Sequence, residues 1–136
     1  EYNNNAQFLG YSRLYGSVPG GQAEYLRVPH ADYGAIKVPT VGEDERYLFL
    51  SDVVPTAWQA VEYADVPPGG SVTVLGLGPI GDMAARIAHH RGLRVIAVDR
   101  VPERIARLDA RGIKTINLDS VDDLDLFARV AVALPP

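Results

Sequence analysis

The chain has 136 residues, which is enough for one domain with a core that buries roughly two-thirds of the unfolded surface. Its net charge is −4 and its basic residues are scattered between acidic ones, which argues against a nucleic-acid-binding protein. No apolar run approaches the roughly 20 residues that span a bilayer, so we expect no membrane segment. Cysteine is absent, which excludes disulfides and thiolate zinc sites from this chain and is compatible with the cytoplasmic location that we expect.

The N-terminal part of the chain combines a loop with two short segments of strand character. Residues 1–21 are rich in Asn, Gly, Tyr and Ser and show no helical period, which predicts a loop. Residues 22–28 alternate in polarity, residues 35–38 are mostly apolar, and a proline follows each segment, so both are predicted to be strands. We expect these strands to pair with strands from elsewhere, because proteins normally cover open sheet edges.

Helical spacing of apolar residues begins at Glu43 and resumes around Trp58. From spacing alone, Asp52 is better explained as the N-terminal cap of this second helix than as a metal ligand. Residues 67–70, Pro-Pro-Gly-Gly, predict a turn after the helix.

The most informative stretch is residues 71–81, where an apolar run leads into three glycines and then into a helical pattern. Gly76, Gly78 and Gly81 have the spacing G-x-G-x-x-G, which in the order strand, turn, helix is typical of a dinucleotide-binding unit. Pro79 suits the first turn of the helix, whose free N–H groups would face a pyrophosphate. Gly92 is the predicted end of this helix.

A second apolar run over residues 93–98 predicts a parallel strand buried on both faces. It ends at Asp99, about twenty residues beyond the glycines, where an acid is expected to bind the ribose hydroxyls of the adenosine. A carboxylate there would repel the 2′-phosphate of NADP, so the pattern favours NAD. Arg100 weakens that preference, since an arginine accommodates a 2′-phosphate.

The rest of the chain continues the alternation of strand and helix. Pro102 begins a predicted helix that ends at Gly112, and residues 115–118 predict a third strand. Ser120 and Asp123 resemble a capping box at the start of a last helix. The predicted fold class is therefore α/β, with a Rossmann-type parallel sheet that corresponds to the first half of a doubly wound sheet.

Four motifs in the right order resemble one family. Residues 20–29 (GGQAEYLRVP), 49–56 (FLSDVVPT), 76–81 (GLGPIG) and 99–104 (DRVPER) resemble the zinc-containing medium-chain alcohol dehydrogenases, and most closely their glutathione-independent formaldehyde dehydrogenase branch. The resemblance covers roughly residues 8–120. It implies a GroES-like catalytic domain, a Rossmann cofactor domain and a catalytic zinc between them. On this basis we expect residues 1–42 to be a β-rich remnant of the catalytic domain and residues 43–136 to be a partial NAD-binding domain.

The resemblance also implies roles for individual residues. Asp52 lies at the position of the third zinc ligand, and Thr56 at the position that contacts the nicotinamide. Asp99 and Arg104 match the two ribose-binding positions. The positions that match the pyrophosphate loop are Gly76, Gly78, Pro79, Ile80 and Gly81.

Departures from the family pattern limit what this chain is expected to do alone. The family's first two zinc ligands, its proton-relay hydroxyl and its four-cysteine zinc lobe have no counterpart here, so we expect a fragment that is inactive by itself and assign no catalytic residue. For the parent enzyme we expect hydride transfer from an alcohol or hydrated aldehyde to NAD, with zinc as a second cofactor and a homo-oligomeric assembly. Two alternatives stay open: a catalytically inactive dinucleotide-binding module, and a zinc-free NADP-dependent reductase relative.

Overall fold

The computed structural model describes residues 8–11, 13–15, 17–39 and 42–121. The chain divides into two compact units, Glu1–Thr40 and Val41–Pro136, and each is described by itself. Within the described part of the chain, no helix has the length and apolar character needed to cross a membrane.

The N-terminal unit contains a 3-10 helix, η1 (Arg13–Tyr15), and one short helix, α1 (Ala31–Gly34). The strands predicted over residues 22–28 and 35–38 are wrong, because the described residues of this unit form no strand. An isolated strand gains no ladder hydrogen bonds, and the described residues of this unit offer no partner strand. The β-rich character expected for this part of the chain is therefore absent from its described residues.

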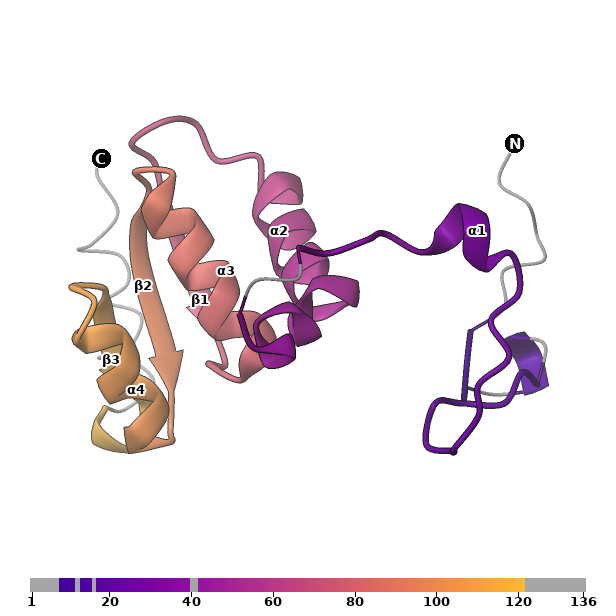
Figure 1. The fold of residues 1–136 in the computed structure, drawn as a ribbon. Coiled ribbons are helices and arrows are strands. Elements are labelled where there is room, and N and C mark those ends of the chain that lie inside the picture. Colours follow the sequence, from indigo (N-terminus) through magenta and orange to yellow (C-terminus); the bar gives the residue numbers. More distant parts are fainter. Residues whose placement is uncertain (1–7, 12, 16, 40–41, 122–136) are drawn as a thin grey trace. The chain divides into compact units, whose positions relative to one another are not determined.

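The larger unit is an α/β layer structure (Figure 1). After a 3-10 helix, η2 (Asp44–Ser51), its elements are α2 (Val53–Tyr63), β1 (Ser71–Leu75), α3 (Pro79–His90), β2 (Arg94–Asp99), α4 (Pro102–Asp109), β3 (Lys114–Asn117) and η3 (Leu118–Ser120). The strands form one parallel sheet in the order β1-β2-β3, with Val72 opposite Val95 and Val98 opposite Ile116. The predicted Rossmann-type sheet is confirmed. The last predicted helix, beginning near Ser120 and Asp123, lies mainly outside the described residues.

The central strand β2 is covered on both faces, as its apolar composition predicts. Val95 and Ala97 face a cluster that includes residues of α2, α3 and α4, and Ile96 and Val98 face a second cluster with Ile116. This burial is consistent with the alternation of side chains along a strand. Because residues of β1 and α3 pack in the same core as β2, the two elements that flank the glycine-rich turn are fixed in place.

Candidate dinucleotide-binding site

Two of the three glycines between β1 and α3 are required by the fold itself. Gly76 has φ +83°, a conformation that favours glycine. At Gly81 a Cβ atom would overlap the carbonyl oxygen of Gly76, so any side chain there would collide with backbone. These two glycines let the chain turn sharply and let the helix approach the strand.

Gly78 differs, because nothing in the fold requires a glycine there. Its φ and ψ are −64° and −173°, which other residues adopt readily, and a Cβ atom built on it would meet no atom within 4 Å. Gly78 is also the N-cap of α3, followed by Pro79 as the first helical residue. The open space therefore lies at a helix end with free N–H groups and a positive dipole, which is where a phosphate binds well.

The carboxylate of Asp99 ties the glycine-rich turn to the end of β2. Its Oδ2 accepts a hydrogen bond from the Leu77 N–H at 2.5 Å. Its Oδ1 accepts from the N–H groups of Arg100 at 2.6 Å and Val101 at 2.9 Å. The side chain is only 7% exposed, and Nη1 of Arg104 lies 3.5 Å from Oδ2. Asp99 thus links three main-chain donors and one arginine.

These donors keep Asp99 ionised. The main-chain N–H groups of Val101, Leu77 and Arg100, together with the Arg104 guanidinium, lower the pKa of Asp99 to about 2, although burial opposes the shift. The carboxylate has about four lone-pair sites, so three main-chain bonds leave it able to accept one more. A ribose hydroxyl would be a suitable donor.

The two arginines predicted to lie at this site have different partners. Arg104 faces Asp99, as expected for a residue on the ribose side of the turn. The Nε atom of Arg100 lies 3.6 Å from Oδ1 of Asp119, and its side chain is 72% exposed. Part of its charge is therefore offset by the carboxylate of Asp119.

The predicted zinc ligand and the predicted nicotinamide contact lie one helical turn apart at the start of α2. Asp52 is the N-cap of α2, as its spacing predicts, but its carboxylate does not bond a backbone N–H of the helix. Its Oδ1 accepts a hydrogen bond from the Thr56 hydroxyl at 2.9 Å, while its carbonyl accepts from the Thr56 N–H at 2.9 Å. The two side chains thus form a local pair.

The described residues do not assemble a zinc site. Catalytic zinc takes about three protein ligands and keeps one open position. Among the residues that the structure describes, no group of three His, Cys, Asp or Glu side chains could hold a metal ion. Asp52 alone does not fit a resident zinc, so the described residues support no chemical step through the metal.

The sequence predicts the position of Asp99 but not its hydrogen bond with the glycine-rich turn. The partner Leu77 has a fully buried side chain and donates its N–H to Asp99. Leu77 occupies a variable position of the glycine motif. Its apolar side chain indicates burial in the sequence, but nothing in the sequence indicates the bond from its N–H to Asp99.

Comparisons with known proteins identify the relatives of this chain. Residues 72–128 match the TrkA-N domain model. The chain is 39% identical over 124 residues to a zinc-type alcohol dehydrogenase-like protein of Schizosaccharomyces pombe, covering 90% of this chain and 29% of that protein. It is 38% identical over 130 residues to a glutathione-independent formaldehyde dehydrogenase of Pseudomonas aeruginosa, covering 92% and 32%. The chain is a homologue of the zinc-type alcohol dehydrogenases.

Solved structures place this homologue in the same group. The alcohol dehydrogenase TADH of Thermus sp. ATN1 matches with a TM-score of 0.76 and 35% identity, covering 88% of this chain and 35% of that one. The alcohol dehydrogenase of Aeropyrum pernix matches with a TM-score of 0.70 and 25% identity, covering 85% and 35%. The predicted family is confirmed, and the inactive module and the zinc-free reductase are not favoured. The chain spans about 30% of the length of the curated relatives that it matches.

Proposed function

We propose that this chain is the NAD-binding portion of a dehydrogenase that transfers hydride between NAD and an alcohol or hydrated aldehyde. The observation that carries the proposal is the empty space at Gly78, where the fold does not need a glycine and a dinucleotide does. In this proposal, Gly76, Gly78, Pro79, Ile80 and Gly81 form the pyrophosphate loop.

The preference for NAD over NADP is part of the proposal and rests on Asp99. With its pKa lowered to about 2, this carboxylate is negative at neutral pH. Its remaining acceptor capacity suits a ribose hydroxyl, and its charge repels a 2′-phosphate. Arg104 would hold the carboxylate in place, and Arg100 would favour NADP only where its pairing with Asp119 is broken.

The substrate and the metal belong to the complete protein. The names of the relatives support an alcohol or aldehyde substrate and a zinc cofactor. In this proposal Asp52 contributes one zinc ligand and Thr56 contacts the nicotinamide. The hydrogen bond between these side chains would orient the carboxylate. A cytoplasmic location and a homo-oligomeric assembly stay predictions.

Calorimetric titration of the chain with NADH and NADPH tests this function. We expect NADH to bind at least about tenfold more tightly than NADPH, a difference of about 1.4 kcal/mol. The variant Arg100→Gln should leave NADH affinity unchanged and change NADPH affinity little, because Arg100 is paired with Asp119. Absence of binding by either dinucleotide would refute the proposal for this chain, and equal affinities would refute the role of Asp99 in selecting NAD.

A further inference from the structure

A hollow of about 580 Å³ lies against α3 and is lined also by residues of α2 and of the segment that precedes β3. We call this space the tryptophan hollow, because it contains the only tryptophan of the chain. Its apolar lining residues are Val54, Trp58, Met83, Ile87 and Ile113. Small-molecule sites have comparable volumes and a mainly apolar lining.

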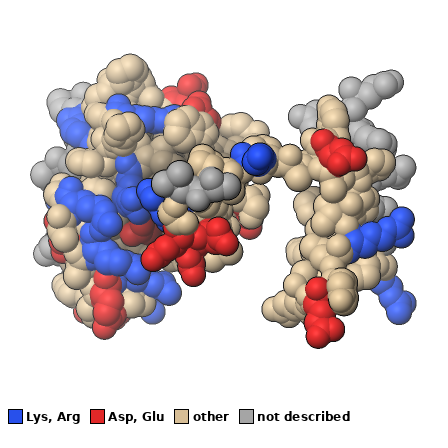
Figure 2. All heavy atoms as spheres, in the orientation of Figure 1, with Lys and Arg blue, Asp and Glu red and all other residues tan. Residues whose placement is uncertain are grey.

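The other residues that line the tryptophan hollow are arginines and histidines, namely Arg86, His89, His90, Arg91 and Arg111. Among the described residues that line it, none is acidic. Figure 2 shows Lys and Arg side chains gathered on one face of the larger unit, although the chain has a net charge of −4. The lining therefore favours a ligand that combines an apolar body with negative charge.

One of the three arginines has no carboxylate partner among the described residues. Nη2 of Arg91 donates a hydrogen bond to Oε1 of Glu62 at 2.5 Å, and Nη1 of Arg86 lies 3.4 Å from a carboxylate oxygen one helical turn earlier. Nη1 of Arg111 donates instead to the carbonyl of Arg107 at 2.6 Å, which leaves its other N–H groups available. A guanidinium binds a carboxylate through two parallel hydrogen bonds, so one uncompensated arginine suits a ligand with one carboxylate.

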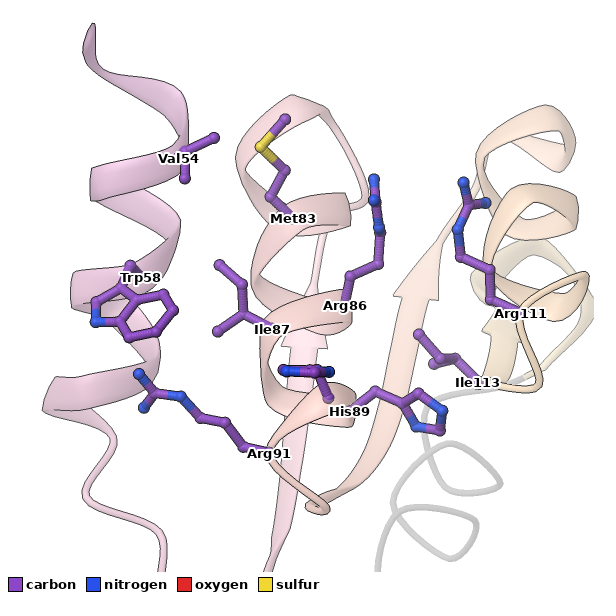
Figure 3. Close-up of a pocket in the computed structure, with 10 residues that line it drawn as sticks. Val54, Trp58, Met83, Arg86, Ile87, His89, Arg91, Arg111 and Ile113 are labelled. Atoms are coloured by element: carbon purple, nitrogen blue, oxygen red, sulfur yellow. The ribbon is translucent and has the colours of Figure 1, made fainter. Parts of the chain in front are cut away.

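The apolar and the charged parts of the hollow lie on different sides of α3 (Figure 3). Trp58 and Ile87 point toward one another from α2 and α3, whereas Arg86 and Arg111 lie between α3 and α4. Trp58 is 50% exposed, with the guanidinium of Arg91 over its ring at 4.3 Å. A ligand that crosses α3 would cover the exposed apolar surface of Trp58, which is favourable, and reach Arg111 with its charged end.

The tryptophan hollow differs from the pocket beside the glycine-rich turn, which has a volume of about 470 Å³. That pocket is lined by Gly78, Pro79 and Arg104, and none of these three residues lines the tryptophan hollow. The two spaces share an edge that includes Arg111. Asp99 lies before the start of α4 and Arg111 lies beyond its end, and a helix of 8 residues is about 12 Å long. The ribose site at Asp99 and the charged end of the hollow are therefore separate.

We propose that the tryptophan hollow binds an amphipathic carboxylate, a molecule with an unbranched apolar chain and one carboxylate, of which a medium-chain fatty acid is the simplest example. The carboxylate binds the guanidinium of Arg111, with Arg86 beside it, and the apolar chain covers Ile87 and Trp58. This binding does not depend on the dinucleotide.

The size of the hollow favours a small ligand over a partner protein. Ten residues line the hollow. A stable protein interface uses roughly 20–30 residues on each side.

Fluorescence titration of the whole chain with decanoate tests the proposal, because Trp58 is the only tryptophan and its emission reports on the hollow. We expect a saturable change in this emission. 1-Decanol has the same apolar chain without the charge and should bind about threefold more weakly or worse, as expected for the loss of an exposed ion pair. Acetate has the charge without the chain and should give no change at the same concentrations.

Two variants separate the charged contact from the apolar one. Arg111→Gln should weaken decanoate binding about threefold or more and leave 1-decanol binding unchanged, which partial unfolding would not do. Trp58→Ala, followed by calorimetry, should weaken the binding of both ligands, because it removes an apolar contact that they share. The matched control is Arg94→Gln, since Arg94 is exposed and lines neither space. The control should bind decanoate like the unaltered chain.

A calorimetric titration at saturating NADH should leave the decanoate affinity within about twofold. Complete displacement by NADH would place the carboxylate in the dinucleotide site and overturn the proposal. It would also be overturned by the absence of a saturable response to decanoate, by equal affinities for decanoate and 1-decanol, or by an Arg111 variant that binds like the Arg94 control. Dimerisation that excludes decanoate from the hollow would overturn it as well, since the apolar wall would then belong to an interface with a second copy.

Discussion

Replacing Gly78 and Gly81 separately by alanine distinguishes a glycine kept for a ligand from a glycine kept for the fold. A Cβ atom at Gly78 meets nothing within 4 Å, whereas one at Gly81 would overlap the carbonyl oxygen of Gly76. Gly78→Ala should therefore leave the fold intact and fill the space at the N-terminus of α3. Gly81→Ala should force β1 and α3 apart.

The expected energies follow from these positions. Gly78→Ala gains about 0.4–1 kcal/mol by restricting the unfolded chain and loses a few tenths or more at an N-cap, so the free energy of unfolding should change by less than about 0.7 kcal/mol. Gly81→Ala overpacks rigid backbone and should cost about 3 kcal/mol, at the upper end of the usual range. NADH affinity should fall at least about tenfold in Gly78→Ala, because the methyl group occupies the position of the pyrophosphate.

Urea unfolding and NADH titration of both variants measure these effects side by side. The predicted pattern is normal stability with weak binding for Gly78→Ala and low stability for Gly81→Ala. If Gly78→Ala binds NADH as tightly as the unaltered chain, the space at Gly78 is not a phosphate site and the reasoning is refuted. If Gly81→Ala is as stable as the unaltered chain, the close approach of α3 to the turn is wrong.

Three further predictions concern Asp99 and the core. Asp99→Asn should lower both the melting temperature and the NADH affinity, because a donor replaces one of the two oxygens that accept from the three main-chain N–H groups. A normal melting temperature with lost NADH affinity would mean that Asp99 binds the ligand without holding the turn. The pKa of Asp99 is lowered from 3.8 to about 2 in the folded chain, so its contribution to stability is present above about pH 4 and lost as the pH falls toward 2. Denaturant unfolding across this range should show a falling free energy of unfolding, and Asp99→Asn should show a smaller fall. Leu108→Ala, at a fully buried position of α4, should cost about 2–5 kcal/mol in urea unfolding, whereas Ile36→Ala, at a position 90% exposed, should cost less than about 0.5 kcal/mol.

The Rossmann-type half of the fold was predictable because its signals are local and agree with one another. Val72 and its neighbours form an apolar run, glycines follow at fixed spacing, and Pro102 marks the start of α4. The approach of Asp99 to the turn follows from the parallel pairing of β1 with β2, which places the ends of both strands together. Spacing alone was therefore sufficient to find the acid.

The remainder depends on contacts that no local pattern encodes. Residues 22–28 and 35–38 have strand composition, but a strand forms only where a partner supplies its hydrogen bonds. The bond from Leu77 to Asp99 joins a main-chain donor to a residue 22 positions away. Likewise, the pocket beside the glycine-rich turn combines Arg86 of α3 with Arg104 and Arg107 of α4, which lie together only after the helices pack on the sheet.

A nuclear magnetic resonance titration of the isotope-labelled chain with NADH tests most directly whether the glycine-rich turn is a dinucleotide site. We expect the largest shifts in the amide signals of Gly78, Ile80 and Gly81 and of residues 99–101, with little change in residues 17–39. Shifts confined to other parts of the chain, or none at saturating NADH, would contradict it.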